Sequence, residues 1–536
     1  MTLSLRPDRA EARRLLGLAW PVMLTSLNWT ILHVTDVIVV GRVGEHEVAA
    51  LSASRSLTYV AIVTGLAWLS GVLVRASRAD GAGDLPETGR ALRDGLVLGL
   101  ILGVAAMLIL GLGGARLLAG IGVAPALIEP GARVVAVMAL GYPFQMVMIA
   151  ASFFLEGISR PRRVTMVNLS ILPINAVLAW ALAGGEWGLP ALGAVGAALA
   201  TVIASALGAV AMVASAMRLP RGEQRGVRRL DRAAWAPTLA GAVGLARFGM
   251  VPAIASGLEL AGFAILIALS TRLGDATAHG FQIVFSVHNV TFALAIGLGS
   301  AAGVRAGNAV GEGAAPAAVS RTLLAVGIAA LAMGACSLIL WTMPAAIVGA
   351  FPALPEAHAA AMVMLMIWAP FILFDGVQVV LVYALRSLGD QVAAGINSII
   401  AYFIVTGGVG WWLVASGWGA PALAWASGIG MLVAAALHGT RFCAIARRLR
   451  GSSGFDASIR PATLTRKAQV QPLGTRRHVQ LGRIEVHRRA RPQGPLLRRD
   501  RPGEDDAALR ILQLGAQVGH ALRGRGRVDD LSRNGK

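Results

Sequence analysis

Three carboxylates interrupt long apolar stretches of the sequence: Asp36 in "LHVTDVIVV", Glu259 in "ASGLELAGF" and Asp375 in "FILFDGVQVV". A charge at the centre of a membrane-spanning helix costs about 2.5–3.5 kcal/mol even on the lenient insertion scale, so such residues usually face a cavity or a partner. If Glu259 and Asp375 converge, their mutual repulsion creates a site that holds a proton or a small cation. The three residues therefore suggest proton or cation chemistry. For Asp36, which is nearer a helix end, simple solvation is the alternative.

Smaller polar side chains within the apolar stretches could complete such sites, although for each one alone hydrogen bonding between helices is the simpler explanation. These side chains are Asn28, His33, Gln145, Asn168, Asn175, Thr201, Gln282, Asn289, Gln378 and Asn397. His33 lies three positions before Asp36, so the two can share one face of a helix. An imidazole paired with Asp36 would shift the pH at which such a site takes up and releases a proton.

The composition indicates whether water or lipid surrounds these residues. Hydrophobic residues make up 56% and charged residues 14% of the 536-residue chain, and the mean hydropathy is +0.67, which exceeds what a soluble globular domain carries. Apolar runs of bilayer-spanning length lie at about 15–38, 48–74, 95–118, 134–155, 164–184, 191–217, 246–270, 279–304, 322–348, 360–385, 393–416 and 420–440. Because lipid offers the backbone no hydrogen bonds, these runs predict helices rather than barrel strands. We therefore predict an all-α membrane protein with twelve transmembrane helices.

An internal duplication divides these spans into two sets of six. "VRASRADGAG" at 74–83 and "VRAGNAVGEG" at 304–313 share six of ten letters at a separation of 230, and "WGLPAL" at 187–192 faces "WGAPAL" at 418–423. Six spans per unit make the second unit enter the membrane from the same side as the first, so the repeats are parallel. We predict an N-terminal bundle over 1–217, a linker over 218–240 and a C-terminal bundle over 241–445.

The arginines predict the orientation of the spans. Residues 1–450 contain 30 arginines and no lysine; with the N-terminus inside, 25 arginines fall in cytoplasmic segments and five in outer ones. Such an excess in short loops is a strong positive-inside signal. Both termini are therefore expected in the cytoplasm.

The last segment, 446–536, differs from the rest. Residues 451–536 hold 18 lysines and arginines against 8 aspartates and glutamates. Their scattered apolar residues predict a disordered tail, which anionic lipid could attract; a non-native terminus is a further alternative. Nucleic-acid binding is not expected, because no binding motif accompanies the charge. Cys336 and Cys443 predict neither a disulfide nor a metal site.

The chain resembles the multidrug and toxic compound extrusion transporters, and the bacterial NorM-type branch in particular, over about residues 10–445. The matching stretches are "LAWPVMLTSL", "DVIVVGRVGEHEVAALS", "GYPFQMVMIAASFFLEGISRPRRVTMVNLSILPIN", "WGLPALGAVGAALAT" and "GSAAGVRAGNAVGEG". The resemblance implies two six-helix bundles around a central cleft that opens alternately to either side. It also implies export of a drug in exchange for an inward sodium ion or proton, across the inner membrane of a bacterium.

The resemblance also assigns residues. The family's first-half acidic residue matches Asp36, and its second-half cation-site carboxylates match Glu259 and Asp375, which would be the sodium ligands if sodium were the coupling ion. The expected supporting or cargo-facing residues are Asn175, Thr201, Gln145, His33 and Phe371. This chain departs from the family at Ala179, where members often carry Asp or Asn, and Phe371 keeps an aromatic ring without a hydroxyl.

Two other functions remain open at this stage. A flippase for lipid-linked precursors shares the wider fold, but its cavity should be strongly cationic, whereas the mid-span charges here are acidic. A polytopic membrane enzyme would need a cluster of acids, histidines or a nucleophile at one membrane face, and no such cluster or metal-ligand spacing is seen. We therefore expect that the protein is not an enzyme and that it needs no cofactor besides the coupling ion. The expected cargo is an organic cation or amphipathic drug, and the expected state is a monomer.

Overall fold

The computed structural model describes residues 9–229 and 231–452, and every regular element in these ranges is a helix. The elements of the first half are α1 (Arg9–Gly41), α2 (Glu45–Gly81), α3 (Leu85–Gly120), α4 (Pro125–Ala139), α5 (Tyr142–Gly157), α6 (Pro161–Gly184), η1 (Glu186–Gly188), α7 (Gly193–Met217), α8 (Gly222–Arg225) and α9 (Arg232–Trp235). The elements of the second half are α10 (Thr238–Arg272), α11 (Asp275–Gly311), α12 (Ala315–Thr342), α13 (Pro344–Gly349), α14 (Pro355–Trp368), η2 (Ala369–Phe371), α15 (Ile372–Leu388), α16 (Gln391–Ser398), η3 (Ile399–Gly407), α17 (Gly408–Ala415) and α18 (Pro421–Ser452). The predicted tail lies almost entirely outside the described residues.

The membrane spans agree with the twelve predicted from the sequence. Within the described ranges, eleven helical stretches are long and apolar enough to cross a membrane, and α4 with α5 forms a twelfth span bent by 49°. The bend lies at Leu140 and Gly141, directly before Pro143 at the start of α5. A proline ring lacks an N–H group and clashes with the preceding turn, so the helix breaks there. The all-α, two-bundle fold class is confirmed.

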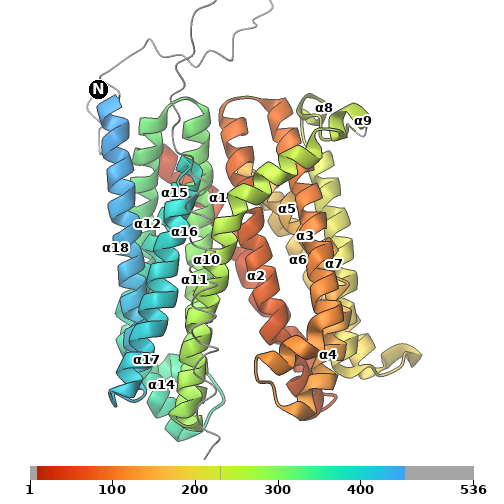
Figure 1. Ribbon diagram of the computed structural model, residues 1–536, viewed down its shortest axis with the longest axis vertical. Helices are drawn as coiled ribbons and strands as arrows, with labels where there is room; N and C mark the ends of the chain where they lie inside the picture. Colours follow the sequence, from red (N-terminus) through yellow and green to blue (C-terminus); the bar gives the residue numbers. More distant parts are fainter. Residues whose placement is uncertain (1–8, 230, 453–536) are drawn as a thin grey trace, which may run out of the picture. The chain divides into compact units, whose positions relative to one another are not determined.

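The two bundles have separate apolar cores. The first core is built around Tyr142 and Phe154 of α5 and Leu69 of α2, whereas the second contains Phe281 of α11 and Trp368 of α14. Figure 1 shows α2 to α7, in red to yellow, as one group and the green to blue helices as the other, with α10 running obliquely between them.

The first helix of each half crosses from one bundle to the other. Near its start, α1 packs Leu15 and Ala19 against α11, and further along it contacts α6, where Asn28 donates to the carbonyl of Asn168. The start of α10 lies on α2, where Trp68 Nε1 donates to the Ala246 carbonyl at 2.9 Å; its later part contacts η3 at Gly262. Each bundle therefore holds the first turns of the other bundle's leading helix.

The repeated decapeptides meet each other where α2 and α11 end. Asn308 Nδ2 donates to the Ser77 carbonyl at 2.9 Å, and a Cβ added at Gly81 would overlap the Asn308 backbone. Gly311 packs in the same way on the Arg78 carbonyl. The glycines at the next turn positions, Gly83 and Gly313, adopt left-handed φ angles of +71° and +72°, which glycine does at no steric cost. The duplicated sequence thus builds a contact between the bundles at the end where α1 begins.

Candidate functional site

Asp36 lies buried in the first bundle between α1, α2 and α6. Its Oδ1 accepts a hydrogen bond from Asn175 Nδ2 at 3.1 Å, and its Oδ2 lies 3.4 Å from the Arg55 guanidinium. Arg55 also donates to the backbone carbonyl of His33 at 3.0 Å. The carboxylate is therefore neutralised by a guanidinium of its own bundle.

Arg55 is one of the five arginines that the sequence analysis assigned to outer segments, and its contact with Asp36 was not expected. It is instead in the third turn of α2 and turns back towards α1. His33, three residues before Asp36, has its ring edge-on to Trp29 at 6.4 Å, and among the described contacts it is the His33 carbonyl that joins the cluster. Thr201, expected nearby, donates to the Ala197 carbonyl of its own helix.

Asp375 lies in the second bundle on α15, and its side chain is almost completely buried. Its Oδ2 lies 3.1 Å from His288 Nε2 of α11. Its Oδ1 accepts from Gln378 Nε2 at 3.1 Å and from the Tyr402 hydroxyl at 3.4 Å. Three helices thus converge on one carboxylate.

The local structure of the second bundle explains this convergence. Tyr402 is carried by η3, a π-helical segment, and π-helical turns occur often at functional sites. Gly262 of α10 has no side chain where it meets the Tyr402 carbonyl, which lets α10 lie directly against η3. On the opposite side, the His288 ring stacks on Trp368 with centroids 5.3 Å apart.

Glu259 lies on α10, partly buried. Among the described residues it forms no side-chain hydrogen bond or ion pair, and the charged groups within electrostatic reach of it are Asp375 and Arg386. The expected convergence of Glu259 and Asp375 is thus electrostatic rather than a direct contact.

Glu156 is a further buried carboxylate that sequence reasoning missed. It ends α5 just before Gly157, so it reads in the sequence as a solvated helix terminus. In the structure it accepts a hydrogen bond from Ser300 Oγ of α11 at 2.7 Å, which joins the two bundles. This hydrogen bond could not be predicted from the sequence, because Ser300 is one of many small residues in its helix.

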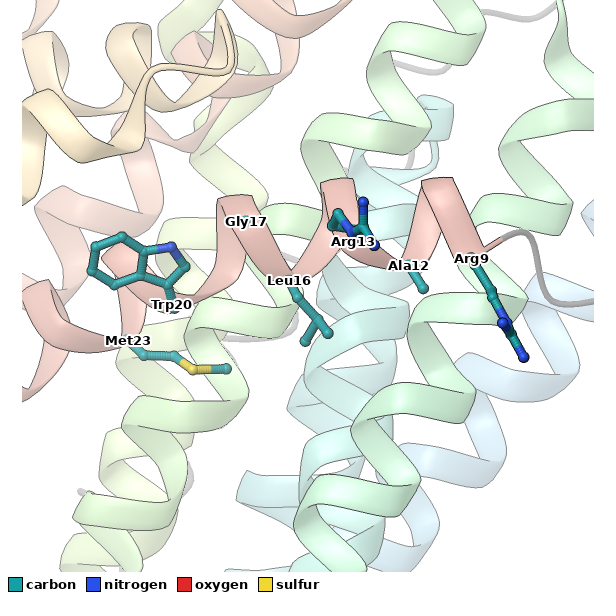
Figure 2. Close-up of a pocket in the computed structure, with 7 residues that line it drawn as sticks. All are labelled: Arg9, Ala12, Arg13, Leu16, Gly17, Trp20 and Met23. Carbon is teal, nitrogen blue, oxygen red and sulfur yellow. The ribbon is translucent and has the colours of Figure 1, made fainter.

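Gln145 and Phe371, which were also expected at the site, form none of the described contacts with these carboxylates. Gln145 is partly buried on α5, beside Gly141. Phe371 packs edge-on against Trp425 at 5.8 Å. A shallow surface pocket of about 580 Å³ lies along one face of α1 and contains none of the carboxylates (Figure 2). Within the described ranges, no group of three or more His, Cys, Asp or Glu side chains is arranged to hold a metal ion.

Comparison with known proteins gives the context for this geometry. The MatE family model matches residues 21–181 and 252–412, one segment in each half. A probable multidrug resistance protein NorM of Bradyrhizobium diazoefficiens is 32% identical over 81% of this chain and 94% of the relative. Another protein of that description, from Deinococcus radiodurans, is 31% identical over 75% and 88%.

Solved structures agree with the fold. The crystal structure of the eukaryotic MATE transporter AtDTX14 superposes with a TM-score of 0.72 at 20% identity, covering 82% of this chain and 98% of that one. A MATE protein crystallised in complex with MaL6 gives a TM-score of 0.75 at 17% identity, covering 82% and 97%. Since the family model matches both repeats and the NorM relatives extend over most of the chain, this protein belongs to the MATE family, the multidrug and toxic compound extrusion transporters.

Proposed function

We propose that this protein exports organic cations or amphipathic drugs from a bacterial cell in exchange for an inward cation, by alternating access. The observation that carries the proposal is the second-bundle pair: the enclosed carboxylate of Asp375 and the unpartnered carboxylate of Glu259 nearby. Two acidic groups in a low-dielectric setting repel each other, and an entering cation relieves that repulsion. The NorM relatives, whose names describe multidrug resistance, support the class of cargo.

The contacts between the bundles support alternating access. At the end where α1 begins, the Glu11 carboxylate pairs with the Arg305 guanidinium through two hydrogen bonds of 2.6 and 2.8 Å. Arg78 donates to the Ser387 carbonyl at the same end. The Glu11 pair holds the start of α1 on the second bundle, whereas the Arg78 bonds join α2 to α15 across the bundle interface, and an exporter must break those bonds to open that side. By the arginine distribution, this is the cytoplasmic side.

The first-bundle carboxylate has a different role in this proposal. Arg55 already supplies a positive charge to Asp36, so a mobile cation would have to compete with a guanidinium fixed in place. Coupling is therefore assigned to the second bundle, and Asp36 to the structure of the first.

Export from vesicles tests the proposal. Glu259→Gln and Asp375→Asn retain size and hydrogen bonding while removing the ionisable groups, so gradient-driven export of a fluorescent organic cation should fail in the double variant. Glu129→Gln is the matched control, because Glu129 is exposed and pairs with Arg133 on the surface. Export at the wild-type rate by the double variant, at equal membrane abundance, would refute the second-bundle site.

A further inference from the structure

A groove on the surface of the first bundle runs between α6 and α7. Its volume is about 690 Å³, and Met166 and Ile174 of α6 line it opposite Leu207 and Ala211 of α7. The apolar walls are exposed, Met166 to 69% and Leu207 to 48%. The other helices packed on α6 and α7 include α1, α4 and α5 of the same half, and Figure 1 shows α7 at the edge of the first bundle remote from the second. The groove therefore faces the lipid of the bilayer.

The groove has the dimensions of a lipid chain. Ala211 and Ser215 of α7 leave space beside the longer side chains of α6. At Gly208 an added Cβ would lie 2.6 Å from Ile171 Cδ1, so the two helices pack closely beneath the groove. From Arg163 to Ile174, α6 rises about 16 Å at 1.5 Å per residue, which is about half of a bilayer core some 30 Å thick. The groove thus accommodates an acyl chain of one leaflet.

Arginines lie at the end of the groove where α6 begins. Arg163 lines the groove, and its Nη1 donates to the carbonyls of Ser215 and Arg218 at 2.9 and 3.4 Å. Arg228, from the linker between the bundles, donates through Nε to the Met217 carbonyl at 2.9 Å. Both guanidiniums therefore meet at the last turn of α7, at the end of the helix that the arginine distribution assigns to the cytoplasm.

Capping of α7 uses only part of each guanidinium. A guanidinium has five N–H donors, whereas these bonds engage one nitrogen of Arg163 and one of Arg228. Among the residues that the structure describes, neither arginine forms an ion pair, although Arg225 nearby in the linker is paired with Asp80. The planar guanidinium binds phosphate oxygens in pairs. Two positive charges without carboxylate partners at the head of an apolar groove complement a ligand with an anionic head and an apolar chain.

We propose that the groove between α6 and α7 binds one anionic phospholipid of the inner leaflet. Its phosphate lies on Arg163 and Arg228, and one acyl chain lies between Met166 and Leu207. Basic pockets between transmembrane helices on the cytoplasmic side are suited to such headgroups. Because Arg228 belongs to the linker, the lipid fastens the linker to the first bundle. The site is separate from the buried carboxylates, so the proposal does not depend on the function proposed above.

Quenching of a fluorophore by brominated lipids measures occupancy of the groove. In a full-length chain whose free cysteines, Cys336 and Cys443, have been replaced, Ser170→Cys carries the fluorophore, because Ser170 lines the groove and is exposed. The protein is placed in phosphatidylcholine bilayers that contain increasing amounts of phosphatidylglycerol with brominated acyl chains. The same titration with brominated phosphatidylcholine gives the reference.

We expect phosphatidylglycerol to bind at the Ser170 probe more than about fivefold more strongly than phosphatidylcholine, because one basic residue near the surface changes the affinity for anionic lipid by about that factor. Leu323→Cys is the matched control probe. Leu323 is exposed near the start of α12, where Arg321 is already paired with Glu312. The ratio of the two affinities should be close to one there.

Two sets of variants separate charge from shape. Arg163→Gln with Arg228→Gln keeps N–H donors for the α7 carbonyls and removes both charges, so the ratio at the groove probe should fall towards one. Arg447→Gln with Arg448→Gln removes two exposed charges of α18, outside the groove, and should leave the ratio unchanged. Ala211→Phe keeps the arginines and fills the groove, so quenching by both lipids should fall.

Every outcome bears on the proposal. Equal affinities for the two lipids at the groove probe would overturn it and leave the arginines as helix caps alone. An equal fall in the ratio for the variant pair at 447 and 448 would indicate a general effect of surface charge and overturn the site. Relief of the quenching by ethidium, an amphipathic organic cation, would mean that the groove takes cargo instead of lipid. If the variant pair at 163 and 228 folds poorly, Ala211→Phe decides, and unchanged quenching in that variant would exclude the groove.

Discussion

Replacing Gly81 and Gly311 with alanine should open the contact between the repeated decapeptides. A Cβ at Gly81 would lie 2.6 Å from Asn308 Cα, and one at Gly311 would lie 2.8 Å from the Ala82 nitrogen. Both distances are shorter than a Cβ tolerates, and the obstructing atoms are backbone, which cannot rotate away. The ends of α2 and α11 must therefore move apart.

The size of the effect follows from the cost of overpacking. An extra methyl group in a tight contact costs about 1–3 kcal/mol, and because both substitutions press on one interface their costs do not add. Taking about 2 kcal/mol for the pair shifts the ratio of parted to closed molecules by about 30-fold, since 1.4 kcal/mol is a factor of ten. The substitutions do not destabilise the molecules in which the two helix ends have moved apart, because alanine stabilises a helix interior relative to glycine by about 0.5–1 kcal/mol.

Labelling of a buried cysteine measures this shift. Ser387 is fully buried at the same interface, and its carbonyl accepts from Arg78. In a chain whose Cys336 and Cys443 have been replaced, Ser387→Cys should react slowly with a maleimide in detergent. Adding the two alanines should raise its rate by about 30-fold, in proportion to the parted fraction.

A glycine away from this contact provides the control. Gly327→Ala places a methyl group on α12 where nothing lies within 4 Å, and it should leave the labelling rate unchanged. If the alanines at 81 and 311 also leave the rate unchanged, the decapeptide contact is not the closure that separates the two sides.

Two further predictions concern charge. Arg55→Met leaves a buried carboxylate unpaired and should destabilise the protein by about 3–5 kcal/mol; Asp36→Asn in the same chain should recover most of the loss of thermal stability in detergent, and a double variant no more stable than Arg55→Met would contradict the ion pair. For orientation, cysteines at positions 85 and 225 should react with an impermeant maleimide only from the cytoplasmic side, and those at 125 and 355 only from outside; labelling of position 225 in intact cells would reverse the topology.

The fold could be predicted because its main determinants are local. A run of some twenty apolar residues suffices to specify a span, and the repeat offset suffices to pair the halves. The bent span over α4 and α5 was counted correctly, since hydropathy does not depend on the break at Gly141. The crossing of α1 and α10 between the bundles could not be predicted from the sequence. It depends on contacts between residues far apart in the chain, such as Trp68 with Ala246.

The site was predicted less completely, for a physical reason. A carboxylate in an apolar span is conspicuous by its cost, so Asp36, Glu259 and Asp375 could be found from composition alone. Their partners could not: Arg55 lies near enough to a helix end to resemble a loop charge, and His288 is a single imidazole in an apolar run. Asn175 could be found because it is a polar residue within an apolar span and because the resemblance pointed to it; the structure places it on Asp36.

Comparing equivalent positions in the two repeats shows which residues stand in one half where the other half has a charged pair. The positions 230 residues after Asp36 and Arg55 are Leu266 and Phe285, both in or against the apolar core of the second bundle. An acid and its base are thus replaced together by two hydrophobic residues. This is the substitution expected where a lone buried charge would be costly but a matched pair, or a matched apolar pair, is tolerated.

The reverse comparison holds for the second-bundle pair. The positions 230 residues before Asp375 and His288 are Gln145 and Thr58, neither of which ionises near neutral pH. Each half therefore has its own acid–base pair at positions where the other half has none, while both halves keep the glycine-rich decapeptides that meet at the closure. An interface between moving bundles must fit on both sides, whereas one exchangeable ion needs a single site. The two halves differ accordingly: a guanidinium lies beside Asp36 in the first bundle, and an imidazole lies beside Asp375 in the second.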